Sequence, residues 1–240
     1  TASGCGYAAD YGAPMYIDRH LYESIPESDF RKKCYIDFAI DEMESKEDAI
    51  VALSNYSDVP EGFLVTAEQG DGVVGGLPVK FRPKNGEHAN QYTAFTVALP
   101  LMRVEEMKLI EAEAAGMQNE ANGIALLTEF AKTRDADYVY GTHTDLYYTN
   151  LSLFQREVWW QRRVELWGEG FATLDIKRFQ AGVIRSYAGS NHASGYRWNV
   201  DHTPDWMNLC IVQTETNNNH LCTNNPTPLR PTEESPEFAW

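Results

Sequence analysis

The sequence predicts a mainly α-helical protein whose centre is a helix hairpin, with an irregular region on either side. A first helix is expected over residues 101–115, ended by Gly116. Its apolar residues lie three or four positions apart, as on one helical face: Val104, Met107, Ile110 and Ala114. A second helix, over residues 119–134, has its own apolar stripe: Ile124, Leu127, Phe130 and Ala131. So short a connection between two amphipathic helices predicts an antiparallel hairpin.

A third helix is expected after the hairpin. Ser152 and Gln155 have the spacing of a capping box, in which each side chain accepts a hydrogen bond from a free N–H of the first turn. This predicts a helix over residues 153–167, and Gly168 and Gly170 would end it.

Shorter elements are expected nearer the N-terminus. Helices are predicted over residues 18–24 and 42–53, and short strands over residues 34–38 and 77–82. From residue 183 to the end the chain is polar and rich in proline. These prolines and the asparagine run at 217–219 oppose a long helix and predict an irregular tail.

Length and composition indicate one soluble globular domain. The 240 residues include 43% hydrophobic and 23% charged residues, which is ordinary for such proteins. We expect a single domain over residues 1–240, with a loop-rich part at 1–98, a helical core at 99–180 and an irregular tail at 181–240. The net charge of -15 repels phosphate backbones and argues against nucleic acid as a partner. No apolar run approaches the length of about 18 residues that a membrane helix needs.

Cysteines and histidines give no metal signature. The cysteines are Cys5, Cys34, Cys210 and Cys222, and no two form a CxxC pair, so a structural zinc site is not expected. Cys210 and Cys222 either close a short loop as a disulfide or are free thiols. Two places combine a histidine with an aspartate, and neither has a third ligand at metal-binding spacing: His143 with Asp145, and Asp201 with His202. We expect neither a metal nor a cofactor.

Two long segments resemble the signatures of the SusD/RagB family of nutrient receptors. Residues 103–114 read RVEEMKLIEAEA, where the family pattern is RxAExxLxxAEA, and Glu105 replaces the usual alanine. Residues 160–170 read WQRRVELWGEG and residues 174–178 read LDIKR. They resemble the second family signature, which runs ERRxEL, then EG, then DLRR or DLKR. Gln161 stands where glutamate is common, so one charge of the usual network is missing.

Weaker matches follow in the order of the family. Residues 29–31 (DFR) resemble its DPR step, and residues 79–81 (VKF) its KY step before the helix pair. Near the end, residues 211–217 and 224–226 resemble its closing elements, with Val212 where proline is expected.

The resemblance implies a fold, a function and a location. Family members pack tetratricopeptide-like helix pairs beside a loop-rich C-terminal region. The family implies a surface lipoprotein of the outer membrane that captures glycans or other nutrients, without catalysis, for a SusC-like TonB-dependent transporter. The chain corresponds to the C-terminal half of such a receptor, so we expect the lipid anchor to lie in a segment outside it. Residues 2–5 read ASGC, like a lipoprotein cleavage site, but we interpret this match as chance, because no signal region precedes it.

Charged residues crowd into the second signature, next to Trp167. They are Arg162, Arg163, Glu165, Glu169, Asp175 and Arg178. Neighbouring carboxylates can act as acid and base, so a glycosidase is one alternative. The favoured interpretation is structural, because guanidinium groups pair with carboxylates and stack on aromatic faces. On this hypothesis, Arg163→Ala leaves a carboxylate unpaired and destabilises the fold by about 2–4 kcal/mol.

Aromatic residues on irregular segments are the candidates for ligand contact, because loops carry function more often than core helices do. The first cluster is Tyr7, Tyr11 and Tyr16. The second is Tyr140, Tyr147 and Tyr148. The third is Tyr196, Trp198 and Trp206, with Asn191 and Asn199 nearby. The alternative for each ring is plain packing, and a further alternative for the whole chain is a protein-docking module that binds the transporter and holds no ligand.

Overall fold

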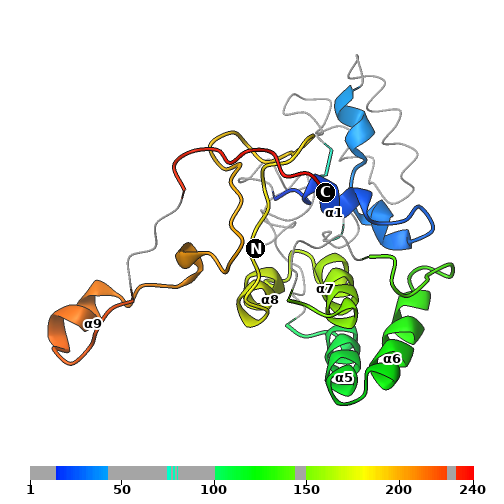
Figure 1. Ribbon diagram of the computed structural model, residues 1–240, viewed down its shortest axis with the longest axis horizontal. Coiled ribbons are helices and arrows are strands. Elements are labelled where there is room, and N and C mark those ends of the chain that lie inside the picture. The colour runs from blue at the N-terminus through cyan, green and yellow to red at the C-terminus, as the bar shows by residue number, and fades with distance from the viewer. Residues whose placement is uncertain are drawn as a thin grey trace, which may run out of the picture.

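The computed structural model describes residues 15–42, 75–76, 78, 80, 101–143, 150–225 and 231–240. Within these residues the chain is mainly α-helical, as the sequence predicts. The helices, in chain order, are α1 (Arg19–Glu23), the 3-10 helices η2 (Phe30–Cys34) and η3 (Phe38–Glu42), α5 (Val104–Gln118), α6 (Glu120–Lys132), α7 (Leu153–Glu165), α8 (Phe171–Arg178), the 3-10 helix η6 (Asp205–Met207) and α9 (Gln213–Asn218). Helices α5, α6 and α7 pack side by side, while the segment that carries α9 extends away from them (Figure 1).

The predicted hairpin is confirmed, because α5 and α6 run antiparallel with one residue between them (Figure 1). That residue, Asn119, caps α6 by accepting hydrogen bonds from the backbone N–H groups of Ala121 and Asn122. An asparagine side chain at this position satisfies donors that the first turn leaves free. The predicted stripe of α6 is also confirmed, since Leu127, Phe130 and Ala131 are buried in it and Ile124 packs against their cluster.

Gly116 does not end α5, which is a correction to the sequence prediction. The helix continues through Gly116 to Gln118. A Cβ atom on Gly116 would lie 2.1 Å from Cε1 of Phe154, and one on Gly123 would lie 2.3 Å from Cα of Gly116. Both glycines therefore let α5 and α6 approach each other closely beneath Phe154, a use of glycine that depends on packing and not on a turn.

The buried face of α5 is another correction. The side predicted to face the core is the outer one, where Val104 is 67% exposed and Met107 and Ile110 are exposed as well. Leu109 and Ala112 are fully buried instead. Apolar residues occur on two sides of this helix, so periodicity alone cannot tell which side packs against α6 and α7.

Helix α7 is the central helix of the described chain. It begins with the predicted capping box of Ser152 and Gln155, and both hydrogen bonds of that box are present. Phe154 of α7 packs against the hairpin. Trp160 packs against the region of α1, and Trp159 packs against Phe179 at the end of α8. Because it contacts three clusters, α7 positions most of the polar groups described below.

The residues of the LDIKR motif lie in a regular helix, α8, which begins after Gly170. Helix α8 contacts α7, and Arg162 of α7 pairs with Asp175 of α8, so residues of the second signature meet from two helices.

The N-terminal part is built from short turns. Helix α1 is confirmed, and it begins at Asp18, whose carboxylate accepts a hydrogen bond from the N–H of Leu21. The strand predicted over residues 34–38 is wrong, because η2 ends at Cys34, η3 begins at Phe38, and between them only an isolated antiparallel bridge joins Tyr35 to Pro78. Apart from Glu42, the helix predicted over residues 42–53 lies outside the described residues, as does most of the strand predicted over residues 77–82.

The tail is irregular, as predicted, and returns to the body of the molecule before it ends. Isolated bridges join Val183 to Val200 and Tyr187 to Phe238. Between them lies the exposed segment with α9, which Asn224 closes by bonding both the N–H and the carbonyl of Ile211.

The two cysteines of this segment are free thiols in the structure, so the loop between them is not closed by a disulfide: Cys210 and Cys222. Over the described part of the chain, every helix is too short or too polar to cross a membrane.

Candidate functional site

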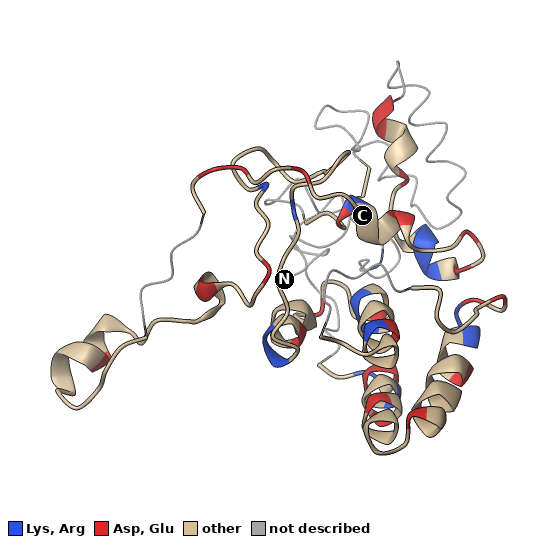
Figure 2. Cartoon of the chain, viewed as in Figure 1, with Lys and Arg blue, Asp and Glu red and all other residues tan. Residues whose placement is uncertain are grey.

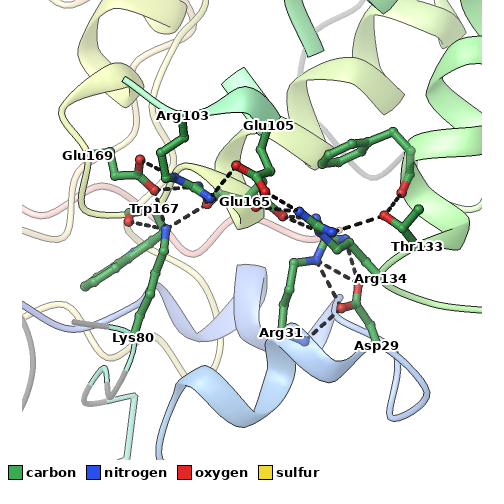
Figure 3. A network of polar contacts seen from close by, with 11 residues as sticks. Asp29, Arg31, Lys80, Arg103, Glu105, Thr133, Arg134, Glu165, Trp167 and Glu169 are labelled. Carbon is green, nitrogen blue, oxygen red and sulfur yellow. Dashed lines mark hydrogen bonds and ion pairs between the residues drawn. The ribbon is translucent and has the colours of Figure 1, made fainter. Parts of the chain in front are cut away.

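A network of ion pairs surrounds the C-terminal end of α7 (Figure 3). Its centre is Glu165, which is 6% exposed. Arg31 donates to this carboxylate over 3.3 Å and Arg134 over 3.0 Å. Arg103 donates over 3.1 Å. These guanidinium groups come from η2, from the end of the hairpin and from its start, so a single carboxylate holds together segments that are far apart in the sequence.

Glu169 extends the same network. Arg103 donates to it through Nε over 2.9 Å and through Nη2 over 2.7 Å, a two-pronged pair. Lys80 donates to Glu169 over 2.6 Å and also to the backbone carbonyls of Glu165 and Trp167. Carbonyls at the end of a helix have no partner within it, so Lys80 satisfies the end of α7 and places a cation at its negative pole.

The charges of this network are balanced in the described residues. Carboxylates of Asp29, Glu105, Glu165 and Glu169 face Arg31, Arg103, Arg134 and Lys80. Burial alone would raise the pKa of Glu165, but the hydrogen bond from Arg134 and the charges of Arg31, Arg134 and Arg103 lower it below its usual value. A carboxylate held ionised in this way is poorly suited to donate a proton near neutral pH. The geometry favours support of the fold over acid–base catalysis.

A second group of ion pairs joins α7 to α8. Asp175 is 2% exposed and accepts hydrogen bonds from Arg162 over 2.8 Å and from Arg178 over 2.7 Å. Arg178 also pairs with Glu113 of α5, through Nη2 at 2.8 Å to one oxygen and through a short contact to the other. Asp175 therefore links α8 to α7, and Arg178 links α8 to the hairpin.

The role expected for Arg163 changes. Its guanidinium lies 5.7 Å from the centre of the Trp159 ring, and in the described part of the chain it forms no ion pair with a carboxylate. The residue whose removal would leave a buried carboxylate short of a partner is its neighbour Arg162. On an α-helix adjacent residues point in directions about 100° apart, so the motif alone does not show which arginine faces α8.

A further buried polar group, which was not predicted from the sequence, lies between the hairpin and α7. Glu157 is fully buried and accepts hydrogen bonds from the hydroxyl of Tyr138 over 3.0 Å and from the N–H of His143 over 2.7 Å. The His143 ring stacks on Trp160, with ring centres 3.5 Å apart. Burial alone would raise the pKa of Glu157, but the hydrogen bonds and charge of His143 lower it. This group has no exposed face and fits a structural role.

An aromatic surface forms where the end of the chain meets α1. Trp240 stacks face to face on His20, with centroids 3.5 Å apart and planes inclined by 4°. The rings of Tyr187 and Phe238 approach Trp240 edge-on, at 5.9 and 5.1 Å. Trp240 is nevertheless 51% exposed. We call His20, Tyr187, Phe238 and Trp240 the aromatic platform.

A cluster of polar groups supports the aromatic platform from below. Asp18 accepts hydrogen bonds from the hydroxyl of Tyr187 over 2.8 Å and lies 3.2 Å from Nε2 of His192. Asn191 accepts from the N–H of Arg19 and donates to the carbonyl of Ile17. Burial alone would raise the pKa of Asp18, but the hydrogen bond with His192, the charge of Arg163 and other donors lower it. Segments near residues 18 and 190 are thereby fixed to each other.

The residues proposed from the sequence to contact a ligand differ in how exposed they are. Tyr16 and Tyr196 are exposed, at 41% and 48%. Trp198 is 3% exposed, because it packs edge-on against Trp206 and beneath the guanidinium of Arg185, which corrects its expected role to packing. Tyr140 packs partly against the hairpin core. The others lie outside the described residues: Tyr7, Tyr11, Tyr147 and Tyr148.

Sequence reasoning did not single out the aromatic platform. The available signal was the pair of aromatic residues at the end of the chain, Phe238 and Trp240, which had no helical or strand pattern to explain them. The two asparagines near the third cluster, Asn191 and Asn199, form hydrogen bonds with backbone groups of the chain. Asn199 bonds backbone groups of Arg185, Ser186 and Pro236, so it holds the tail together.

Comparisons of the chain with protein-family models, with curated proteins and with solved structures found no match. Among the described residues, no group of histidine, cysteine, aspartate and glutamate side chains has the arrangement of a metal site.

Proposed function

We propose that this protein captures glycans, or other nutrients with an apolar ring face, without chemically changing them. The observation that carries the proposal is the contrast between its charged and its aromatic residues. Most charged residues of the second signature are held in ion pairs with fixed partners, whereas aromatic rings on irregular segments stay at the surface: Tyr16, Tyr196 and Trp240. Aromatic faces beside polar groups are typical of sugar sites.

The resemblance to SusD/RagB receptors supports the same proposal. Residues quoted for that resemblance from separate parts of the sequence come together in the ion-pair network, among them Arg31, Lys80, Arg103 and Glu169 (Figure 3). Such convergence is what a shared structural framework would require. On this proposal the hairpin is tetratricopeptide-like, the protein acts at the outer membrane through a lipid anchor outside the chain, and it delivers its ligand to a SusC-like TonB-dependent transporter.

Purified protein tested against a glycan array and then by titration calorimetry will check the proposal, with product analysis of the same mixtures by chromatography. Binding without any new product is the expected result. Turnover of a glycan would show an enzyme and contradict the proposal, and so would the absence of binding to every glycan by both this chain and a longer receptor that contains it.

A second candidate, a docking module without a ligand site of its own, is favoured by one observation. The outer face of α5 is apolar and exposed, with Val104, Met107, Ile110 and Met117 along it. Faces of this kind often mark protein contacts. Glycan binding by the longer receptor alone, together with binding of this chain to the transporter, would favour this candidate over the first.

A further inference from the structure

We propose that Trp240, backed by His20, is the surface on which one sugar ring of the captured glycan stacks. This inference rests on the proposed function and names the site within it. No residue of the aromatic platform belongs to the motifs that carry the family resemblance, so the site follows from the geometry of this chain alone.

One face of the Trp240 ring is covered, and the residue as a whole is still 51% exposed. His20 covers that face in a parallel stack with a centroid separation of 3.5 Å. The rings of Tyr187 and Phe238 are inclined to the Trp240 ring by 67° and 74°, so neither of them lies flat on it. The exposed part of the side chain is an apolar surface that can pack against the C–H groups of a sugar ring.

The segment that leads to Trp240 is fixed by backbone hydrogen bonds, and the ring itself by its stack on His20. Phe238 donates its N–H to the carbonyl of Ser186 over 2.9 Å, next to the bridge between Tyr187 and Phe238. Ser235 is fixed in the same manner, because its N–H donates to the carbonyl of Arg197 and its hydroxyl accepts from the N–H of Asn199. A pre-ordered aromatic side chain loses little conformational freedom on binding, which favours affinity.

The polar groups beneath the platform are already committed to one another. The hydroxyl of Tyr187 donates to Asp18 and accepts from the N–H of His20. Both side-chain atoms of Asn191 bond backbone groups. Few of these groups remain to read the pattern of sugar hydroxyls, so recognition at Trp240 depends on the shape of the ring face. The fitting ligand class is an oligosaccharide of pyranoses with equatorial hydroxyls, whose faces consist of C–H groups.

Titration calorimetry of the full chain with cellohexaose and maltohexaose tests the inference, using wild type, Trp240→Ala, Trp240→Phe and Phe30→Ala. Phe30 is an equally exposed ring on η2 that is not a candidate for ligand contact, and it serves as the matched control. We expect Trp240→Ala to weaken binding at least about ten-fold, as loss of a central aromatic anchor does. Trp240→Phe keeps a flat ring and should stay within about three-fold of wild type, as should Phe30→Ala.

The outcomes separate the two proposals. If wild type binds a glycan and Trp240→Ala binds it equally well or better, the Trp240 site is wrong while glycan capture stands. If neither wild type nor a longer receptor that contains it binds these probes or any glycan of the array, both are wrong. Melting temperatures of the variants guard against misfolding. Should Trp240→Ala unfold, a ligand-induced change in tryptophan fluorescence that wild type shows and Trp240→Phe lacks supports the site, and an equal change in both contradicts it.

Discussion

The ion-pair network and the aromatic platform use polar residues in opposite ways. Around Glu165, long basic side chains from separate segments converge, and this one carboxylate is held by Arg31, Arg103 and Arg134. At the platform, short polar side chains bond mostly to backbone groups, and the Trp240 ring stays half-exposed. Figure 2 shows acidic and basic residues crowded on the central helices. The first region supports the fold, and the second is where we propose that the ligand binds.

The largest effect should follow from removing the centre of the network. Glu165→Ala leaves the guanidinium groups of Arg31, Arg103 and Arg134 short of their shared partner, so we expect a loss of about 3–5 kcal/mol in the free energy of unfolding. Urea denaturation measures it, with the exposed Glu129→Ala on α6 as control, expected within about 0.5 kcal/mol of wild type. Equal stabilities of the two variants would show that the network does not support the fold.

Adjacent arginines of α7 provide a matched pair for the second contact. Arg162→Ala leaves the buried Asp175 with Arg178 alone and should destabilise by about 2–4 kcal/mol. Arg163→Ala removes a contact with the Trp159 ring and a charge that acts on Asp18 from a distance, so we expect the smaller loss, about 1 kcal/mol or less. Thermal unfolding of both variants tests the order of their stability losses. A larger loss for Arg163→Ala would support the ion-pair role that the motif predicted for Arg163.

Acid should weaken the network in a defined range. The pKa of Glu165 is lowered in the folded protein, so its stabilisation is complete above the unfolded value of about 4.3 and is lost as the pH falls through the lower folded value. Because glutamine has no carboxyl group to protonate, the Glu165→Gln variant does not have this pH-dependent stabilisation. We therefore expect the stability gap between wild type and Glu165→Gln, measured by urea denaturation, to be constant from pH 7 to about pH 5 and to shrink below about pH 4.3. A gap that stays constant down to the acid unfolding of the protein would contradict the assigned role.

At the platform we expect a smaller effect than those of Glu165→Ala and Arg162→Ala. Tyr187→Phe removes the hydroxyl that donates to Asp18 and accepts from the N–H of His20, so we expect a loss of about 1–2 kcal/mol. Hydrogen exchange should show the faster opening in residues near α1 and leave the hairpin unchanged. A loss as large as that of Glu165→Ala would erase the distinction drawn between the two regions.

Local signals predicted the secondary structure best where all residues of the signal lie within one turn or one helix. Ser152 and Gln155 lie in one turn, and the structure has both hydrogen bonds that their spacing indicates. The stripe of α6 also lies on its buried side. Gly116 was misjudged because its neighbour Phe154 lies 38 positions later in the sequence (154 − 116), beyond the reach of any local rule.

By itself, the sequence determined the helical class, the hairpin and the charged residues that gather near α7, because periodicity, caps and residue type are local properties. Only the tertiary structure decided which side of α5 is buried, which arginine meets Asp175 and which aromatic ring stays exposed. Each of these depends on a partner brought from a distant part of the chain. Trp240 shows the reason plainly, since its stack on His20 joins residues at opposite ends of the described chain.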